Sequence, residues 1–131
     1  MNDVYAAMNS WRPTEFSWGR FDCCQFVAHV LREMTGRDLI PWRYTSEREA
    51  EHIIDSHGGL TETVTAVLGA DPVRVDALKS GDPVVWVGRM NGQPEIGLGI
   101  VLPQAFAWVH HRTARIGSAS LRHCTHGWRV V

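Results

Sequence analysis

The stretch that decides the fold is a short loop running into a helix, Phe16-Ser17-Trp18-Gly19-Arg20-Phe21-Asp22-Cys23-Cys24-Gln25-Phe26-Val27. An aspartate just before a helix accepts hydrogen bonds from the free amides of the first turn, and Gln25 three residues after Asp22 fits a capping box. Apolar residues then recur at helical spacing, and Gly36 supplies a C-terminal stop. We therefore expect an amphipathic helix over residues 22–35.

Cys23 falls on the first turn of this helix. Unpaired amides and the helix dipole favour an anion there, which lowers the pKa of a thiol and makes it a better nucleophile. Cysteine is also among the most buried residue types, so a cysteine on an amphipathic helix is more often part of the core. Position alone leaves both interpretations of Cys23 open.

The surroundings of Cys23 resemble the signature of the NlpC-type cell-wall endopeptidases, a papain-like cysteine peptidase family. That signature has an aromatic residue, a Trp-Gly pair and an Asp-Cys pair, which match Phe16, Trp18-Gly19 and Asp22-Cys23. A second segment, Leu78–Trp86, resembles the family's Leu-x-x-Gly-Asp entry into its first core strand. The resemblance implies that Cys23 is the nucleophile position.

The match spans about residues 11 to 131, and the chain is most similar to small NlpC-like proteins encoded among phage and prophage tail genes. Trp18, Asp22 and Trp108 are the residues expected to shape the binding site beside Cys23.

The order of elements predicts one α+β domain over residues 1–131, because helical patterns come first and a mostly antiparallel sheet follows. Helices are expected over residues 3–11, 22–35, 46–58 and 61–69, the third capped by Ser46 and the fourth by Thr61. Strands are expected over residues 84–87, 96–102, 105–110 and 128–131, with a hairpin turn at Asn91-Gly92 and an ambiguous segment at 115–121. The resemblance implies a papain-like fold with the cysteine helix packed on the sheet.

A papain-like site pairs its cysteine with a histidine, which a third polar group orients. The resemblance places the histidine position at Gly97, the third polar position near Trp108, and a tyrosine position at Phe16. We therefore expect the cysteine scaffold to be kept while three polar partners are missing. Gly97 should face Cys23, with the space left by its absent side chain open or filled by Trp18 or Trp108.

Two other histidines are candidates for the base. His110 and His111 lie at the end of the third expected strand and point to opposite faces of the sheet, so one of them shares the face of the cysteine helix. The alternative is a solvated pair at a strand end, which we favour because spacing alone does not place a base.

Composition sets the remaining bounds. The 131 residues carry a net charge of −1 without a basic block, which does not indicate a nucleic-acid partner. No run is long enough to span a membrane, and the N-terminus lacks the features of a signal peptide. Three cysteines do not make a disulfide framework, and His123, Cys124 and His126 lack the spacing of a zinc site. We expect no metal and no other cofactor.

Two functions are therefore compared. The first is a structural or binding component of a phage tail tip, made in the bacterial cytoplasm and located in the virion tail, with other phage tail proteins and peptidoglycan as partners. The second is an active cysteine endopeptidase that cleaves peptidoglycan stem peptides. The missing histidine favours the first function. An aromatic interaction surface is expected among five tryptophans, Trp11, Trp42, Trp86, Trp108 and Trp128.

Overall fold

The structure is a computed structural model that describes residues 3–90 and 92–131. Four α-helices are described, α1 (Val4–Asn9), α2 (Cys23–Thr35), α3 (Glu47–Ser56) and α4 (Leu60–Leu68). The strands are β1 (Val73–Arg74), β2 (Pro83–Met90), β3 (Gln93–Leu102), β4 (Ala105–Val109), β5 (Ile116–Ser120) and β6 (Cys124–Gly127), with short 3₁₀ turns η1 (Val75–Ala77) and η2 (Leu121–His123). In these residues no helix is long and apolar enough to cross a membrane.

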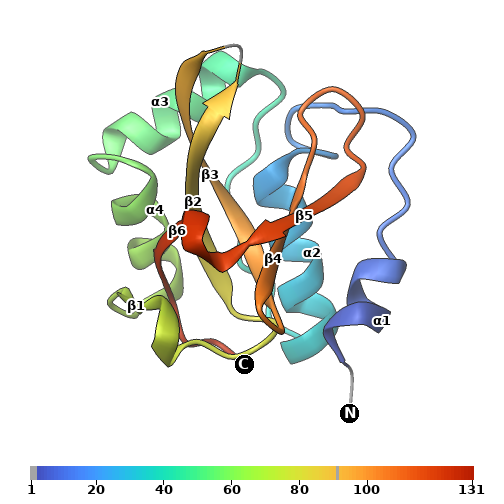
Figure 1. Ribbon diagram of the computed structural model, residues 1–131. Coiled ribbons are helices and arrows are strands. Elements are labelled where there is room, and N and C mark those ends of the chain that lie inside the picture. The colour runs from blue at the N-terminus through green and yellow to red at the C-terminus, as the bar shows by residue number, and fades with distance from the viewer. Residues whose placement is uncertain (1–2, 91) are drawn as a thin grey trace.

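The strands form one antiparallel sheet in the order β1-β6-β2-β3-β4-β5 (Figure 1). Helices α1, α2 and α4 contribute to one core on one face of this sheet. Helices that precede a largely antiparallel sheet are the α+β arrangement expected from the sequence, and that expectation is confirmed.

Helix α2 packs on one face of the sheet and forms the larger core. Its buried residues are Phe26, Val27, Ala28, Val30 and Leu31. They join sheet residues that alternate along three strands and so share one face, Val85, Leu98, Ile100, Leu102, Ala107 and Val109. The amphipathic pattern of residues 22–35 is therefore satisfied by burial against the sheet.

The opposite face of the sheet carries a second, aromatic cluster. Val84, Val101 and Phe106 are buried there, and Trp86 and Trp108 pack against them. The Trp86 and Phe106 rings are stacked with their centroids 6.3 Å apart, and the Phe106 and Trp108 centroids are 5.5 Å apart. Two of the five tryptophans expected at the surface thus contribute to this cluster.

Strand β3 pairs with its two neighbours over different lengths. It pairs with β2 from Ile100 to Gln93, so the expected hairpin is present, although Asn91 of its turn lies outside the described residues. Strand β4 pairs only with Ile100–Leu102. The first half of β3 therefore has no strand on its β4 side, and the candidate functional site lies at this opening.

Several expected boundaries are wrong. The last strand is Cys124–Gly127 rather than residues 128–131, because Trp128 enters the core and its amide donates to the Pro83 carbonyl (3.1 Å). The fourth helix begins at Leu60, after Gly59, so Thr61 does not cap it. The ambiguous segment at 115–121 contains β5, and the two-residue β1 had no recognisable pattern.

Two of the tryptophans expected at the surface belong to the core. Trp128 is completely buried and Trp11 is 7 % exposed. Their polar nitrogens are satisfied inside the protein, since Trp11 Nε1 donates to the Ala114 carbonyl (2.9 Å) and Trp128 Nε1 to the Thr65 hydroxyl (3.1 Å). The surface interpretation is therefore wrong for this pair.

Asp82 anchors the C-terminal end of the chain. Its carboxylate is 1 % exposed and accepts hydrogen bonds from the amides of Val130 (2.7 Å) and Val131 (2.9 Å) through one oxygen. The other oxygen accepts from the Lys79 amide (2.8 Å), which closes the turn that leads into β2. The Gly-Asp pair recognised in the sequence therefore sets the start of β2 and also holds the last residues against it.

Replacing Asp82 with alanine should lower the free energy of unfolding by about 3 kcal/mol, because three amides lose a charged acceptor in a buried setting. Urea denaturation followed by tryptophan fluorescence measures the loss. Asp71→Ala, at an exposed position, is the matched control and should change stability by less than about 0.5 kcal/mol. Equal stabilities of the two variants would contradict this role of Asp82.

Candidate functional site

The start of α2 is fixed by a buried carboxylate. Asp22 is 1 % exposed, and one of its oxygens accepts from the Gln25 amide (2.8 Å), which is the expected N-cap bond. The other oxygen accepts from the Gly19 amide (2.8 Å) and from the Tyr44 hydroxyl (2.8 Å). The expected cap is confirmed, and the side chain of Gln25 hydrogen-bonds to the Tyr44 hydroxyl.

Gly19 of the Trp-Gly pair sits where no other residue fits well. Its φ of +84° lies in the left-handed region, and a Cβ atom there would overlap the Tyr44 carbonyl oxygen. The close approach brings the loop before α2 against the segment that contains Tyr44. Trp18 is thereby held beside Phe16, with ring centroids 5.0 Å apart at 84°.

The Cys23 thiol lies in surroundings that favour its anion. A hydrogen bond from the Cys24 thiol is the main cause that lowers the pKa of Cys23, and the amides of Leu98 and Cys24 add to it. Burial and the Asp22 carboxylate oppose this shift, but the pKa remains below its usual value. The donor Cys24 has a pKa well above the usual value, because its proton is held by Cys23 and because it is buried.

Leu98 links Cys23 to an aromatic side chain on the other face of the sheet. The Leu98 amide donates to the Cys23 sulfur, and the Leu98 carbonyl accepts from Trp86 Nε1 (3.2 Å). A residue in a strand directs its amide and carbonyl to the same side, and here that side is the opening left by β4. Cys23 and Trp86 therefore take the hydrogen-bonding positions that a neighbouring strand would otherwise occupy.

Trp86 also fills the space beside Gly97. A Cβ atom at Gly97 would stand only 2.6 Å from Cζ2 and 2.7 Å from Cε2 of the Trp86 indole. The two residues are direct cross-strand partners, so their side chains share a face. The position that the resemblance assigns to a histidine is thus covered by an indole, which comes from Trp86 and not from Trp18 or Trp108 as expected.

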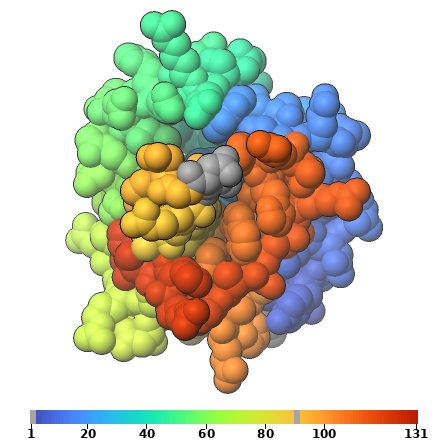
Figure 2. Space-filling model, turned by 45° about the horizontal axis from the view of Figure 1, so that its top comes forward, coloured from blue at the N-terminus to red at the C-terminus, as the bar shows by residue number. Residues whose placement is uncertain are grey.

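A cleft of about 1000 Å³ opens beside Cys23. One wall is the first half of β3, and the other is the segment that follows β4. In Figure 2 the yellow β2–β3 hairpin and the orange segment after β4 face each other across this region. The cleft brings together Cys23 and the expected binding residues Trp18 and Trp108, with Phe16, Trp86 and Gly97 beside them. Asp22 is buried and supports the cleft through the cap of α2.

The two candidate bases lie on the far wall of this cleft. Strand β4 ends at Val109, so His110 and His111 belong to the turn that follows it, and both are exposed. His110 packs on Trp108 with centroids 5.3 Å apart, and His111 lies 6.2 Å from Phe16. Among the described residues, neither histidine is one of the groups that shift the pKa of Cys23.

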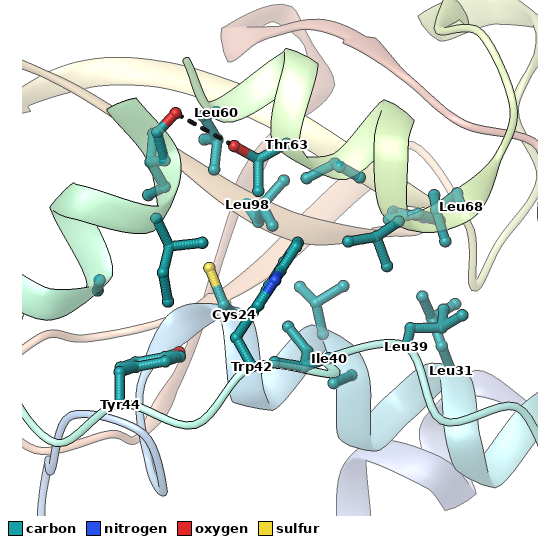
Figure 3. Close-up of a pocket in the computed structure, with 18 residues that line it drawn as sticks. Cys24, Leu31, Leu39, Ile40, Trp42, Tyr44, Leu60, Thr63, Leu68 and Leu98 are labelled. Atoms are coloured by element: carbon teal, nitrogen blue, oxygen red, sulfur yellow. Dashed lines mark hydrogen bonds between the residues drawn. The ribbon is translucent and has the colours of Figure 1, made fainter. Parts of the chain in front are cut away.

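Cys24 faces a separate, apolar cavity of about 70 Å³ between α2, α3, α4 and the loop that precedes α3. Figure 3 shows the Cys24 sulfur at this cavity, with Trp42 reaching in from the loop. The polar groups of its wall are satisfied within the protein, since the Thr63 hydroxyl donates to the Gly59 carbonyl (2.7 Å) and Tyr44 donates to Asp22. The two adjacent cysteines of α2 therefore lie in different environments, Cys23 at the cleft and Cys24 at the apolar cavity.

In the part of the chain that the structure describes, no group of three or more His, Cys, Asp or Glu side chains is arranged to hold a metal ion. Cys124 and His126 lie on β6, and the His126 ring is hydrogen-bonded to the hydroxyls of Thr61 (2.7 Å) and Thr125 (2.8 Å). Half-burial raises the pKa of the Cys124 thiol to about 11.

Sequence reasoning missed two residues that shape the site. Trp86 is expected at the surface from its sequence, although the register of the expected β2–β3 hairpin already places it directly across from Gly97. No sequence pattern indicates a role for Tyr44, because its hydrogen bond to Asp22 joins residues that are 22 positions apart in the chain.

Comparisons with known proteins address the fold and the family. A solved structure described as the "Crystal structure of NlpC/p60 domain of peptidoglycan hydrolase SagA" is similar over 98 % of both chains, with a TM-score of 0.59 and 17 % sequence identity. At this identity the likeness shows the fold, and the papain-like NlpC-type fold expected from the sequence is confirmed. A search of curated proteins finds no match. A family model described as "Domain of unknown function (DUF6950)" matches residues 2–130, so the chain belongs to that family.

Proposed function

We propose that this protein is a binding component of a phage tail tip that uses an NlpC/p60-like fold without hydrolysing peptide bonds. The observation that carries the proposal is the position of Trp86. Its indole occupies the space that a side chain at Gly97 would need, and its Nε1 is committed to the Leu98 carbonyl. Cys23 keeps its place at the start of α2 and the donors that favour its thiolate. The position that the resemblance assigns to the histidine, Gly97, is instead covered by an aromatic ring.

The chemical reason is the proton that acyl transfer has to move. A cysteine peptidase needs a group that accepts the thiol proton and later donates a proton to the leaving amine. Indole nitrogen is a donor that does not take up a proton at neutral pH, so Trp86 cannot replace an imidazole. A thiolate at Cys23 without that group has lost most of its catalytic advantage.

The binding role is supported by the character of the cleft. Tryptophan rings offer large, rigid contact surfaces, and Trp18, Trp86 and Trp108 line one cleft beside Cys23. The similar NlpC/p60 domain is described as part of a peptidoglycan hydrolase, so peptidoglycan is a ligand to test. The resemblance to tail-gene proteins supports location in the virion tail and other tail proteins as partners.

An active cysteine endopeptidase is the second candidate function. It is favoured by the lowered pKa of Cys23 and by His110 and His111, which line the same cleft. This function requires one of these exposed histidines to move to within hydrogen-bonding distance of the Cys23 sulfur, because neither is bonded to it in the structure.

Incubation with purified peptidoglycan separates the two functions. The wild-type protein should release no more soluble peptide fragments than Cys23→Ala, measured by liquid chromatography of the supernatant, because the cysteine lacks a base. Cys124→Ala is the matched control for loss of a thiol, and an active endopeptidase shows that the substrate is competent. Release by wild type and by Cys124→Ala, but not by Cys23→Ala, would establish the peptidase.

The thiol environment makes a separate prediction on pH. The rate of alkylation by iodoacetamide follows the thiolate fraction, which rises as pH passes through the pKa, so Cys23 should react at lower pH than an unperturbed thiol. Cys24→Ala removes the main donor to the Cys23 sulfur and should move the midpoint of the rate profile to higher pH. Peptide mass spectrometry assigns the modified residue, and Cys124→Ala should leave the midpoint unchanged. A midpoint in Cys24→Ala at or below that of wild type would contradict the hydrogen-bond account.

The tail-tip role predicts how variants behave in phage particles. Cys23→Ala should be incorporated and leave infectivity intact, whereas Trp18→Glu and Trp108→Glu should reduce incorporation at least about tenfold, because they charge the binding cleft. Tyr5→Glu, at an exposed position on α1 outside the cleft, is the control. Immunoblots of purified particles and plaque counts measure both effects. Loss of infectivity in Cys23→Ala particles that assemble normally would overturn the binding role.

A further inference from the structure

The first half of β3 is a free sheet edge inside the cleft. Strand β4 pairs with Ile100–Leu102 and then diverges, while β2 continues to pair with β3 as far as Gln93. The segment Pro94–Gly97 lines the cleft, and the turn after β4 lines the opposite wall. An unpaired edge of this kind presents backbone donors and acceptors to whatever enters the cleft.

The direction of these backbone groups follows from the ladder. The Val101 amide donates to the Asp82 carbonyl (2.9 Å) and its carbonyl accepts from the Gly81 amide (2.8 Å), so the polar groups of Val101 point away from β4. Polar groups alternate along a strand, so those of Ile96 and Leu98 point toward the β4 side. The Leu98 amide is already bonded to the Cys23 sulfur, and the Leu98 carbonyl to Trp86 Nε1. The amide and carbonyl of Ile96 face the open cleft.

Pro94 supports this assignment. It has the same orientation as Ile96, since the two are separated by one residue, and proline is tolerated in a strand only where no ladder partner needs its amide. Its carbonyl points into the cleft with the two polar groups of Ile96. The free edge therefore offers one donor and two acceptors, bounded by Leu98 on one side and by the proline ring on the other.

Two exposed apolar side chains, Ile96 and Val87, lie beside the free edge of β3. Ile96 is 57 % exposed and Val87 is 42 % exposed, and with Tyr5 they make up the exposed large apolar residues of the described chain. Val87 and Ile96 are direct cross-strand partners at a position without ladder hydrogen bonds, where side chains come closest together. Exposed apolar residues gathered beside unpaired backbone groups indicate a protein-binding edge.

We propose that an extended segment of a partner protein adds to β3 at Ile96 as a further strand, within the cleft and next to Cys23. This inference rests on the proposed function, because it assigns the cleft a peptide that stays bound and is not cut. Backbone hydrogen bonds to Ile96 and Pro94 provide the register, as in other complexes formed by strand addition. The residue opposite Ile96 is apolar and packs beside the exposed Ile96 side chain, which itself lies next to Val87.

The neighbouring residues of that segment point to the other face of the sheet, because side chains alternate. They meet Gly97, the indoles of Trp86 and Trp108, and Glu95, which shares this face. A carboxylate beside indole faces favours a lysine or an arginine there. The opposite wall carries Arg112 with His110 and His111, so an acidic residue fits farther along the segment. The partner segment therefore alternates apolar residues with residues of both charges.

A displayed library of random heptapeptides, selected on immobilised wild-type protein, supplies the probes. The enriched peptides should alternate apolar and charged residues. Fluorescence anisotropy then measures their affinity for wild type, Ile96→Pro and Ile96→Ala. Proline removes the amide hydrogen that faces the cleft but no bond to β2, and should weaken binding about tenfold or more. Alanine keeps the amide and should weaken binding less than proline does.

A second arm keeps the test independent of how Ile96→Pro folds. Each peptide is also made with its backbone N-methylated at the residue that pairs with Ile96, and this form should bind wild type about tenfold more weakly. Thermal unfolding followed by circular dichroism checks that the variants are folded. Equal binding of methylated and unmethylated peptides, or a library that yields no peptide sensitive to Ile96, would overturn the inference. Cleavage of bound peptides would instead refute the non-hydrolytic function and leave the strand addition standing.

Discussion

The carboxylate of Asp22 is the contact on which the arrangement of this protein depends. It is buried, and its two oxygens accept hydrogen bonds from a residue of the preceding loop, from the first turn of α2 and from a tyrosine 22 residues farther along the chain. A buried carboxylate is costly unless every acceptor site is used, and here the three donors come from three separate segments. The same side chain therefore starts the helix that carries Cys23, shapes the Trp18-Gly19 loop and attaches the segment that covers the apolar cavity beside Cys24.

A second constraint acts from the sheet. Because β4 leaves β3 after Ile100, the amide and carbonyl of Leu98 lack strand partners, and buried backbone groups need partners of some kind. A thiol from α2 satisfies one of them and an indole from β2 satisfies the other. Cys23 is therefore part of the structure of the sheet as well as of the helix, so its presence does not by itself indicate catalysis. Its lowered pKa is a consequence of the same contacts, since the Leu98 amide is one of the donors that stabilise the anion.

The elements that the sequence predicted well are those whose causes are local. The start of α2 at Asp22, its end at Gly36 and the Ser46 cap of α3 each depend on residues within four positions, and all three are present. The errors arise where distant contacts decide. Trp128 leaves the sheet because its indole fills the core and reaches Thr65 on α4, and Trp11 is buried against Phe21 and Phe26. No local pattern distinguishes these tryptophans from Trp18 or Trp42, and the role of Trp86 follows only once the β2–β3 register is known.

The geometry around Gly97 also explains why a catalytic pair would not be restored by one substitution. A histidine at position 97 would collide with the Trp86 indole, whose atoms already stand 2.6–2.9 Å from the place of a Cβ atom. Reducing Trp86 to a small residue would make room, but it would remove the half-buried hydrogen bond to the Leu98 carbonyl, which contributes about 0.5–1.5 kcal/mol. It would also open the aromatic cluster of Phe106 and Trp108. The Trp86 indole therefore needs a glycine at position 97. A catalytic histidine at 97 would require a second substitution at Trp86 at the same time.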